Sequence, residues 1–178
     1  MMIRDLFDFP IYLTPAIPNG TAVARNAGRW RGVGFNWATP LELFKQLDRE
    51  FGFTLDVCAE DWNAKCTNFF TAADNGLMQD WGVNRCFMNP PYGKSLGRWM
   101  AKAFTSCLNG ATVVCLVPAA TDTDWWHRFA MRGEIRFLRG RPRFLTAQGK
   151  WQQTFTPSVI IVFGEQTRMW SRPFDRRQ

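Results

Sequence analysis

The pentapeptide Asn89-Pro90-Pro91-Tyr92-Gly93 contains the residue types that suit methyl transfer to a planar amino group. Such an amine is a poor nucleophile, because its lone pair is delocalised into the neighbouring ring or carbonyl. Two oxygen acceptors that hold its hydrogens, here the Asn89 side chain and the Pro90 carbonyl, can turn the lone pair toward a methyl donor. Pro91 biases Pro90 toward an extended conformation and so presets the direction of that carbonyl. Tyr92 offers a flat face on which the substrate ring can stack.

The same pentapeptide could be only a turn, because Asn, Pro and Gly are common turn residues. Its position favours a functional role. It follows the short apolar run Cys86-Phe87-Met88, and ligands of open α/β sheets bind outside the carboxyl ends of the strands. Two further predicted strands end in polar or special residues, at Asp56 and at Pro118-Ala119-Ala120-Thr121. Asp56 could hold a cationic or hydroxyl-bearing ligand, or it could be a capping or turn aspartate.

The elements that must position these residues alternate between strand and helix patterns. Thr39 as N-cap, Pro40 at the first helical position and Glu42 form a capping box, and Gly52 ends that helix. Apolar stripes predict further helices over residues 96–108 and 123–131. Strands are expected over residues 53–57, 68–71, 85–88, 111–117, 134–138, 143–146 and 158–163.

This alternation predicts an α/β fold with a mostly parallel sheet, helices on both faces and antiparallel strands near the C-terminus. The 178 residues fit one globular domain. We expect an irregular N-terminal arm over residues 1–36, the main domain over residues 37–165 and a basic C-terminal tail over residues 166–178.

Charge is distributed unevenly along the chain. Residues 1–89 hold 8 Lys/Arg and 10 Asp/Glu, whereas residues 90–178 hold 14 Lys/Arg and 5 Asp/Glu. A basic half favours a polyanionic partner, and arginine suits forked contacts to phosphates and guanine edges. The alternative is a solvated basic face without a partner.

Other function classes are disfavoured. The five cysteines are odd in number and lack Cys-x-x-Cys spacing, so we expect reduced core thiols. The single histidine, His127, argues against a zinc site, and we expect no metal. No apolar run approaches a membrane span and the first residues do not form a signal sequence, so we expect a cytoplasmic protein without a membrane partner.

The chain resembles the phage-type DNA N-6-adenine methyltransferases, which use S-adenosylmethionine. The resemblance covers most of residues 36–163 in order. The matching segments are Trp37-Ala38-Thr39-Pro40, Leu55-Asp56-Val57-Cys58-Ala59, Asn63-Ala64-Lys65-Cys66, Asp74-Asn75-Gly76-Leu77, Asp80-Trp81, Asn89 to Gly93, Leu116-Val117-Pro118-Ala119, Thr121-Asp122-Thr123, and Gly140 to Phe144 with Pro157-Ser158. The resemblance implies a Rossmann-like methyltransferase fold and adenine in double-stranded DNA as the substrate, methylated after base flipping.

The resemblance also implies roles for single residues. Thr39 and Pro40 would line the methionine end of the cofactor site. Asp56 and Ala59 would correspond to the main cofactor motif, and without a glycine-rich loop the close approach to the ligand would come from Cys58-Ala59. The remaining candidates are Asp74 or Asp80 around the adenosine, Glu60 or Asp61 at the ribose, and Asn89, Pro90, Pro91 and Tyr92 at the adenine.

DNA would be held by the basic second half. Arg139, Arg141 and Arg143 share one face if their segment is extended, and with Lys150 and Trp151 they would form the loop that enters the DNA. Trp151 could instead be a packing residue. We expect a monomer, and a role in DNA methylation such as restriction-modification. An RNA base or a protein glutamine is an alternative acceptor, and a catalytically inactive DNA-binding module is an alternative function.

Overall fold

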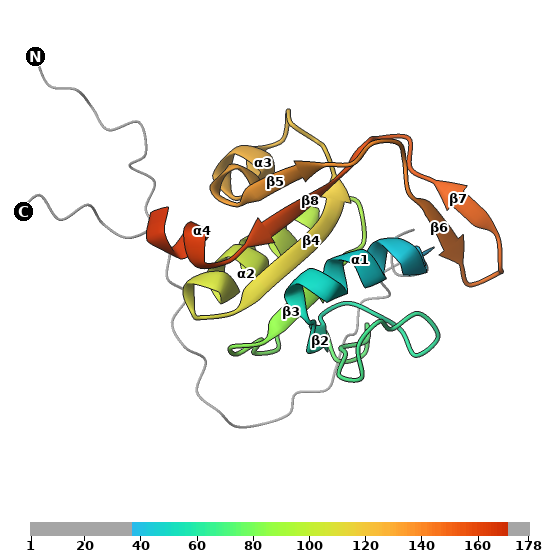
Figure 1. Ribbon diagram of the computed structural model, residues 1–178, viewed down its shortest axis with the longest axis horizontal. Helices are drawn as coiled ribbons and strands as arrows, with labels where there is room; N and C mark the ends of the chain where they lie inside the picture. The colour runs from blue at the N-terminus through green and yellow to red at the C-terminus, as the bar shows by residue number, and fades with distance from the viewer. Residues whose placement is uncertain (1–36, 171–178) are drawn as a thin grey trace, which may run out of the picture.

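The computed structural model describes residues 37–170 and has an α/β fold built on a mixed sheet (Figure 1). The predicted arm over residues 1–36 and the end of the predicted tail, residues 171–178, lie outside the described residues. The five strands of the main sheet stand in the order β2-β3-β4-β8-β5. Their bounds are Leu55–Asp56 for β2, Arg85–Met88 for β3, Thr112–Pro118 for β4, Ser158–Phe163 for β8 and Glu134–Phe137 for β5.

Strand direction changes across this sheet. The neighbours β2, β3 and β4 are parallel, whereas β8 runs antiparallel to both β4 and β5. The predicted antiparallel pairing near the C-terminus is therefore confirmed. The sheet is more mixed than we expected, because two of its four pairings are parallel and two are antiparallel.

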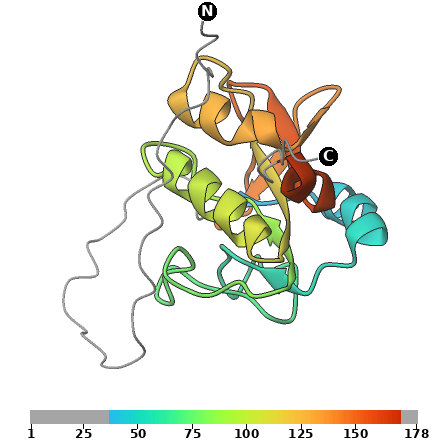
Figure 2. The same ribbon diagram turned by 90° about the vertical axis from the view of Figure 1, so that its left-hand side faces the viewer.

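Helices cover both faces of the sheet. Alternate residues of β4 point to opposite sides, so Val113 packs in one core cluster and Val114 in the other. The first cluster includes the buried residues of α2 (Leu96–Leu108), and the second includes those of α1 (Leu41–Phe51). Figures 1 and 2 show α1 on one side of the sheet and α2 with α3 (Asp124–Arg128) on the other.

Helix α1 ends as predicted but begins differently. Gly52 caps its end in the left-handed region, with φ of +58°, and donates its N–H to the Asp48 carbonyl. At the start, Pro40 is the N-cap residue, and no side chain caps the helix. The predicted capping box is therefore wrong, because the Thr39 hydroxyl has a different partner, described below.

A second, three-stranded sheet has the order β1-β6-β7 and is antiparallel throughout. Its strands are Trp37–Ala38, Arg143–Thr146 and Trp151–Gln153. Trp37 stacks on the buried ring of Phe144 with centroids 5.5 Å apart, which anchors the strand that leads into Thr39. In Figure 1 the hairpin of β6 and β7 projects to the right of the main sheet. The sequence predicted β6 but neither β1 nor β7.

Other predicted elements are shorter than expected. Residues 68–71 form only one isolated bridge, between Phe69 and Asp56. The predicted helix over residues 123–131 is divided into α3 and the short helix η1 (Ala130–Arg132). Helix α4 (Glu165–Trp170) occupies the beginning of the predicted tail.

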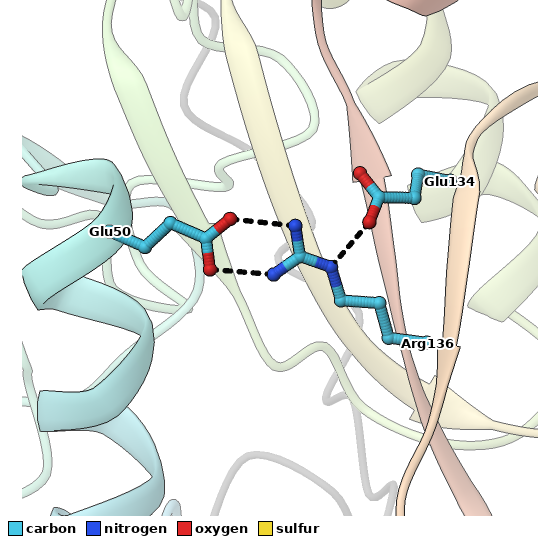
Figure 3. A network of polar contacts seen from close by, with 3 residues as sticks. All are labelled: Glu50, Glu134 and Arg136. Carbon is cyan, nitrogen blue, oxygen red and sulfur yellow. Dashed lines mark hydrogen bonds and ion pairs between the residues drawn. The ribbon is translucent and has the colours of Figure 1, made fainter.

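An ion-pair network ties the edge strand β5 to the end of α1 (Figure 3). The Arg136 guanidinium donates to both carboxylate oxygens of Glu50 and to Glu134, each at 2.6 Å. The hydrogen bond and positive charge of Arg136 lower the pKa of the Glu50 carboxyl. Arg136 therefore has a structural partner on each side, although it belongs to the arginine-rich part of the sequence.

Candidate active site

Three candidate segments lie at one edge of the sheet. Because β2, β3 and β4 are parallel neighbours, their carboxyl ends meet there. Asp56 ends β2, the segment from Asn89 to Tyr92 follows β3, and Pro118 ends β4. This edge is where α/β sheets bind their ligands.

Asn89 is held in one orientation by the segment before α1. Its side-chain Nδ2 donates to Thr39 Oγ1 at 3.1 Å and to the Trp37 carbonyl at 3.4 Å. The amide nitrogen is therefore occupied, and the amide oxygen is left as an acceptor for another molecule. Thr39 is only 4% exposed, so its bond to Asn89 is shielded from water.

Asp56 is buried, and its carboxylate is bonded to the loop that follows β2. Oδ1 accepts from the Cys58 backbone N–H at 3.4 Å, and Oδ2 accepts from that of Lys65 at 3.1 Å. Burial raises the pKa of Asp56 to about 6, although the hydrogen bonds from Lys65 and Cys58 and the Lys65 charge oppose the shift. Asp56 thus shapes the loop, as the turn interpretation predicted, and also faces a pocket.

That pocket, which we call the edge pocket, has a volume of about 10 Å³, room for one small group. Polar side chains and two aromatic rings surround it. Its lining residues are Trp37, Thr39, Asp56, Cys58, Asn63, Lys65, Phe87 and Asn89. The structure thus brings together four of the predicted site residues, Thr39, Asp56, Cys58 and Asn89, with four for which the sequence predicted no role in the site.

Lys65 is the most informative of the missed residues. It lines the edge pocket with Asp56, and its charge interacts with that carboxylate. Partial burial lowers the pKa of the Lys65 amine, and the neighbouring Asp56 charge opposes that shift. Only the segment Asn63-Ala64-Lys65-Cys66, in the family resemblance, pointed to it.

The residues after Asn89 are well anchored. Pro90 and Pro91 are buried, whereas Tyr92 is partly exposed. The Tyr92 hydroxyl donates to the Leu116 carbonyl of β4 at 3.2 Å, and burial of this hydroxyl raises the pKa of the phenol. Tyr92 is therefore fixed at its hydroxyl end, while part of the side chain stays accessible for stacking.

The loop after β2 carries the other predicted cofactor residues. Cys58 lines the edge pocket, and burial raises the pKa of its thiol well above the ordinary value. Ala59 is buried, and its N–H donates to the Phe70 carbonyl at 2.9 Å. Glu60 and Asp61 follow in a turn in which the Glu60 carbonyl accepts from the Asn63 N–H at 3.0 Å.

Asp74 and Asp80 lie in different surroundings. Asp74 accepts from the N–H and hydroxyl of Thr71, which lower the pKa of its carboxyl. Its turn continues to Gly76, where a Cβ would collide with the Val57 carbonyl just beyond β2. Asp80 accepts from the Gly82 N–H at 2.9 Å, in a turn that precedes β3. Neither residue lines the edge pocket.

The predicted DNA-contacting arginines surround a second depression, which we call the basic groove. It is open, has a volume of about 490 Å³ and lies between α1 and the segment that leads into β6. Its lining residues are Pro40, Leu43, Gln46, Leu138, Arg139, Gly140, Arg141, Pro142, Arg143 and Trp151. Pro40, a predicted cofactor residue, therefore lines this groove and directly follows Thr39 of the edge pocket.

The cations of this groove are exposed. Arg139, Arg141 and Arg143 form no ion pair within residues 37–170, and neither does Lys150 in the turn between β6 and β7. Only Arg143 of the three arginines lies in a strand, so the extended segment that would put all three on one face is not formed. Gly140, with φ of +81°, turns the chain between Arg139 and Arg141. Trp151 is 56% exposed, which contradicts the alternative that it is a core residue.

Several simpler expectations can be compared with the structure. All five cysteines are free thiols, four of them buried, as expected. Trp126 is buried and Trp125 packs against the core, whereas His127 is exposed. In the described part of the chain, no group of three or more His, Cys, Asp or Glu side chains could hold a metal ion. Over the same range, no helix is long and apolar enough to cross a membrane.

The sequence of this chain is similar to those of known proteins. The family model for DNA N-6-adenine-methyltransferase (Dam) matches residues 31–174, which include the edge pocket and the basic groove. The chain is 38% identical over 133 residues to the DNA N-6-adenine-methyltransferase of Haemophilus phage HP1 (strain HP1c1), covering 71% of this chain and 77% of that protein. It is 40% identical over 67 residues to the putative methyltransferase YfdM of Escherichia coli (strain K12), covering 34% and 74% respectively.

Proposed function

This chain belongs to the DNA N-6-adenine-methyltransferase (Dam) family, and we propose that it methylates the exocyclic amine of adenine in double-stranded DNA with S-adenosylmethionine. The observation that carries this proposal is the fixed orientation of Asn89 at the carboxyl end of β3. An amide oxygen held there, beside a partly exposed tyrosine, is the acceptor that a planar amine requires. We also assign a Rossmann-like fold, which the parallel order of β2, β3 and β4 supports.

We propose that the edge pocket receives one charged group of the amino-acid end of S-adenosylmethionine, because its volume of about 10 Å³ leaves room for one small group. A zwitterionic amino acid carries an ammonium and a carboxylate, and Asp56 and Lys65 supply the complementary charges. Thr39 lies in the same pocket. The bound cofactor supplies an electrophilic methyl group on a sulfonium sulfur.

The remainder of the cofactor needs a binding surface outside this small pocket. We propose that it follows the loop through Cys58 and Ala59, with Asp74 at the adenosine. Asp74 is favoured over Asp80 because its turn packs on the end of β2 through Gly76, whereas the turn of Asp80 precedes β3.

Asn89 and Pro90 orient the acceptor. The Asn89 amide oxygen and the Pro90 carbonyl accept the two hydrogens of the adenine amine, while Tyr92 and Pro91 support the base. Because the Asn89 amide nitrogen and the Tyr92 hydroxyl are bonded to the protein, these groups need little rearrangement when the base arrives. The principal contribution of these residues is to position the amine, because displacement of a methyl group requires in-line contact.

The target adenine must leave the duplex to reach Asn89, because its amine otherwise lies inside the base stack. We propose that Arg139, Arg141, Arg143 and Lys150 hold the DNA backbone while this occurs. Their exposure and the lack of ion pairs among the described residues support this role. One chain supplies both the edge pocket and the basic groove, so we propose that a monomer acts, in the cytoplasm where its DNA substrate lies.

The test is transfer of a tritiated methyl group from S-adenosylmethionine to purified duplex DNA, RNA and protein. We expect label in adenine-containing duplex DNA and none in duplexes that lack adenine. Preferential labelling of RNA or of a protein glutamine would reassign the acceptor. DNA binding without cofactor binding, measured by tryptophan fluorescence, would indicate an inactive DNA-binding module.

A further inference from the structure

Phe155 is the most exposed large apolar side chain among the described residues, at 97%. It lies in the connection between β7 and β8, and the sequence predicts no function for it. Single exposed apolar residues are common on protein surfaces. The anchoring of this connection and its neighbours distinguish Phe155 from such residues.

The residues around Phe155 fix the connection. Thr154 is buried, and its hydroxyl donates to the Thr156 carbonyl at 2.6 Å. The Pro157 carbonyl accepts from the Ala119 N–H at 2.8 Å, just beyond the end of β4. Phe155 therefore stands between two anchored points, which hold its ring in solvent.

The connection adjoins the proposed adenine site. Ser158, the first residue of β8, pairs with Pro118 at the end of β4, the strand whose Leu116 carbonyl accepts from the Tyr92 hydroxyl. Phe155 is three residues from Ser158, so at most about 10 Å of chain separates them. The connection that carries Phe155 is thus joined to the end of β4, the strand that also binds the Tyr92 hydroxyl.

On the other side, Phe155 is connected to the basic groove. Gln153 pairs with Arg143 across the β6–β7 hairpin, and its side-chain amide donates to the Arg141 carbonyl at 3.0 Å. Phe155 follows Gln153 by two residues. An apolar ring is therefore placed between the surface proposed to hold DNA and the residues proposed to hold the base.

We infer that Phe155 inserts into the base stack beside the target adenine and keeps its vacated position open. This inference rests on the proposed function. Unstacking and unpairing a base costs free energy, and an apolar wedge between base steps compensates by stacking where the base had been. Phe155 would thus be a positioning residue that favours the extrahelical adenine without contacting the reacting amine.

The test compares Phe155→Ala with the wild-type protein on two duplexes. Both carry the sequence in which the wild-type product contains methyladenine, and one has the target adenine opposite an abasic site. We expect Phe155→Ala to lower kcat/KM at least tenfold on the paired duplex and less than threefold on the unpaired one. Phe155→Trp should retain activity on both, because its ring can also stack.

Val83→Ala provides a matched control, because Val83 is 82% exposed and lies before β3, at the opposite edge of the sheet. It should leave both rates unchanged. The inference is overturned if Phe155→Ala acts equally on both duplexes, if it has no effect on the paired duplex, or if sedimentation shows that it disrupts a dimer. If the wild-type protein methylates neither duplex, the proposed function itself fails.

Discussion

The edge pocket and the basic groove adjoin through Thr39 and Pro40. They differ in whether their polar side chains are bonded to other groups of the protein. In the pocket, Asp56 and Asn89 are bonded to the protein itself. In the groove, the arginines are exposed and form no ion pair within the described residues. The difference matches two tasks, because transfer chemistry needs fixed acceptors whereas a polyanion needs available cations.

Arg136 shows the same difference among arginines that are close together in the sequence. It lies three positions before Arg139, but Glu50 and Glu134 occupy its guanidinium. Arginine density alone therefore does not identify a nucleic-acid surface. Within residues 37–170, Arg136 has carboxylate partners whereas Arg139, Arg141 and Arg143 have none, and this separates the groove arginines from the structural one.

The largest effect is expected for Asn89→Ala, which removes a pocket acceptor and leaves the groove intact. Methyl transfer should fall by about 10²- to 10³-fold, the usual consequence of losing one preorganised polar group at a reacting centre. DNA affinity should stay within a factor of about two, measured by fluorescence anisotropy. Equal losses of transfer and DNA binding would show that the two regions do not have separate tasks.

Replacing Arg139, Arg141 and Arg143 together by alanine should weaken DNA binding and leave the acceptors of the edge pocket intact. The affinity for DNA should then fall less steeply with salt: the magnitude of the slope of log affinity against log salt should be smaller by about three, roughly one for each lost phosphate contact. Arg136→Ala is the control, because it should leave this slope unchanged and lower the free energy of unfolding by about 1 kcal/mol or less. A change in salt slope for Arg136→Ala would contradict the distinction between the paired and unpaired arginines.

Thr39→Val tests whether the hydroxyl orients Asn89. The substitution keeps the shape of the side chain but leaves the partly buried Asn89 donor with a weaker set of partners, which costs about 1–3 kcal/mol. We expect roughly tenfold slower transfer at saturating cofactor and DNA, from single-turnover rates. Thr39→Ser should restore the rate, and an effect on cofactor affinity alone would identify Thr39 as only a cofactor ligand.

A smaller effect is expected from Asp56, whose titration should make both the stability of the protein and its affinity for S-adenosylmethionine depend on pH. Its folded pKa of about 6 lies above its ordinary value of 3.8, so its contribution to stability is lost as pH rises from about 4 to about 6. Affinity for S-adenosylmethionine should change in the opposite direction, weakening below about pH 6 by up to tenfold per pH unit, because the ionised carboxylate binds the ammonium. Titration calorimetry should show this weakening for the wild-type protein. The affinity of Asp56→Asn for S-adenosylmethionine should not change with pH over the same range. A pH dependence that persists in this variant would exclude Asp56 as its source.

The sequence predicted the parts of this contrast that depend on local pattern. The bounds of β3, β6 and β8 agree with expectation, and the alternation of strands and helices placed Asp56 and Asn89 at one edge. The capping box at Thr39 failed because a residue 50 positions away competes for the same hydroxyl. Local sequence cannot reveal such a partner.

Exposure was equally difficult to predict. The three residues of β7 are all exposed and lack the apolar alternation that indicates a strand, so the second sheet was missed. An arginine-rich segment also does not reveal which guanidinium has a carboxylate partner, because Glu50 of α1 meets Arg136 only in the folded chain. The pairing state that distinguishes the two regions is therefore a tertiary property.

The central claim is that the Asn89 side of the sheet edge delivers a methyl group to the adenine amine. Its most direct test is mass spectrometry of nucleosides released from duplex DNA after reaction with wild-type protein and with Asn89→Ala. We predict N6-methyldeoxyadenosine as the methylated product of the wild-type reaction, with the variant reduced by at least a hundredfold. Methylated cytosine, or undiminished methyladenine with Asn89→Ala, would contradict the account.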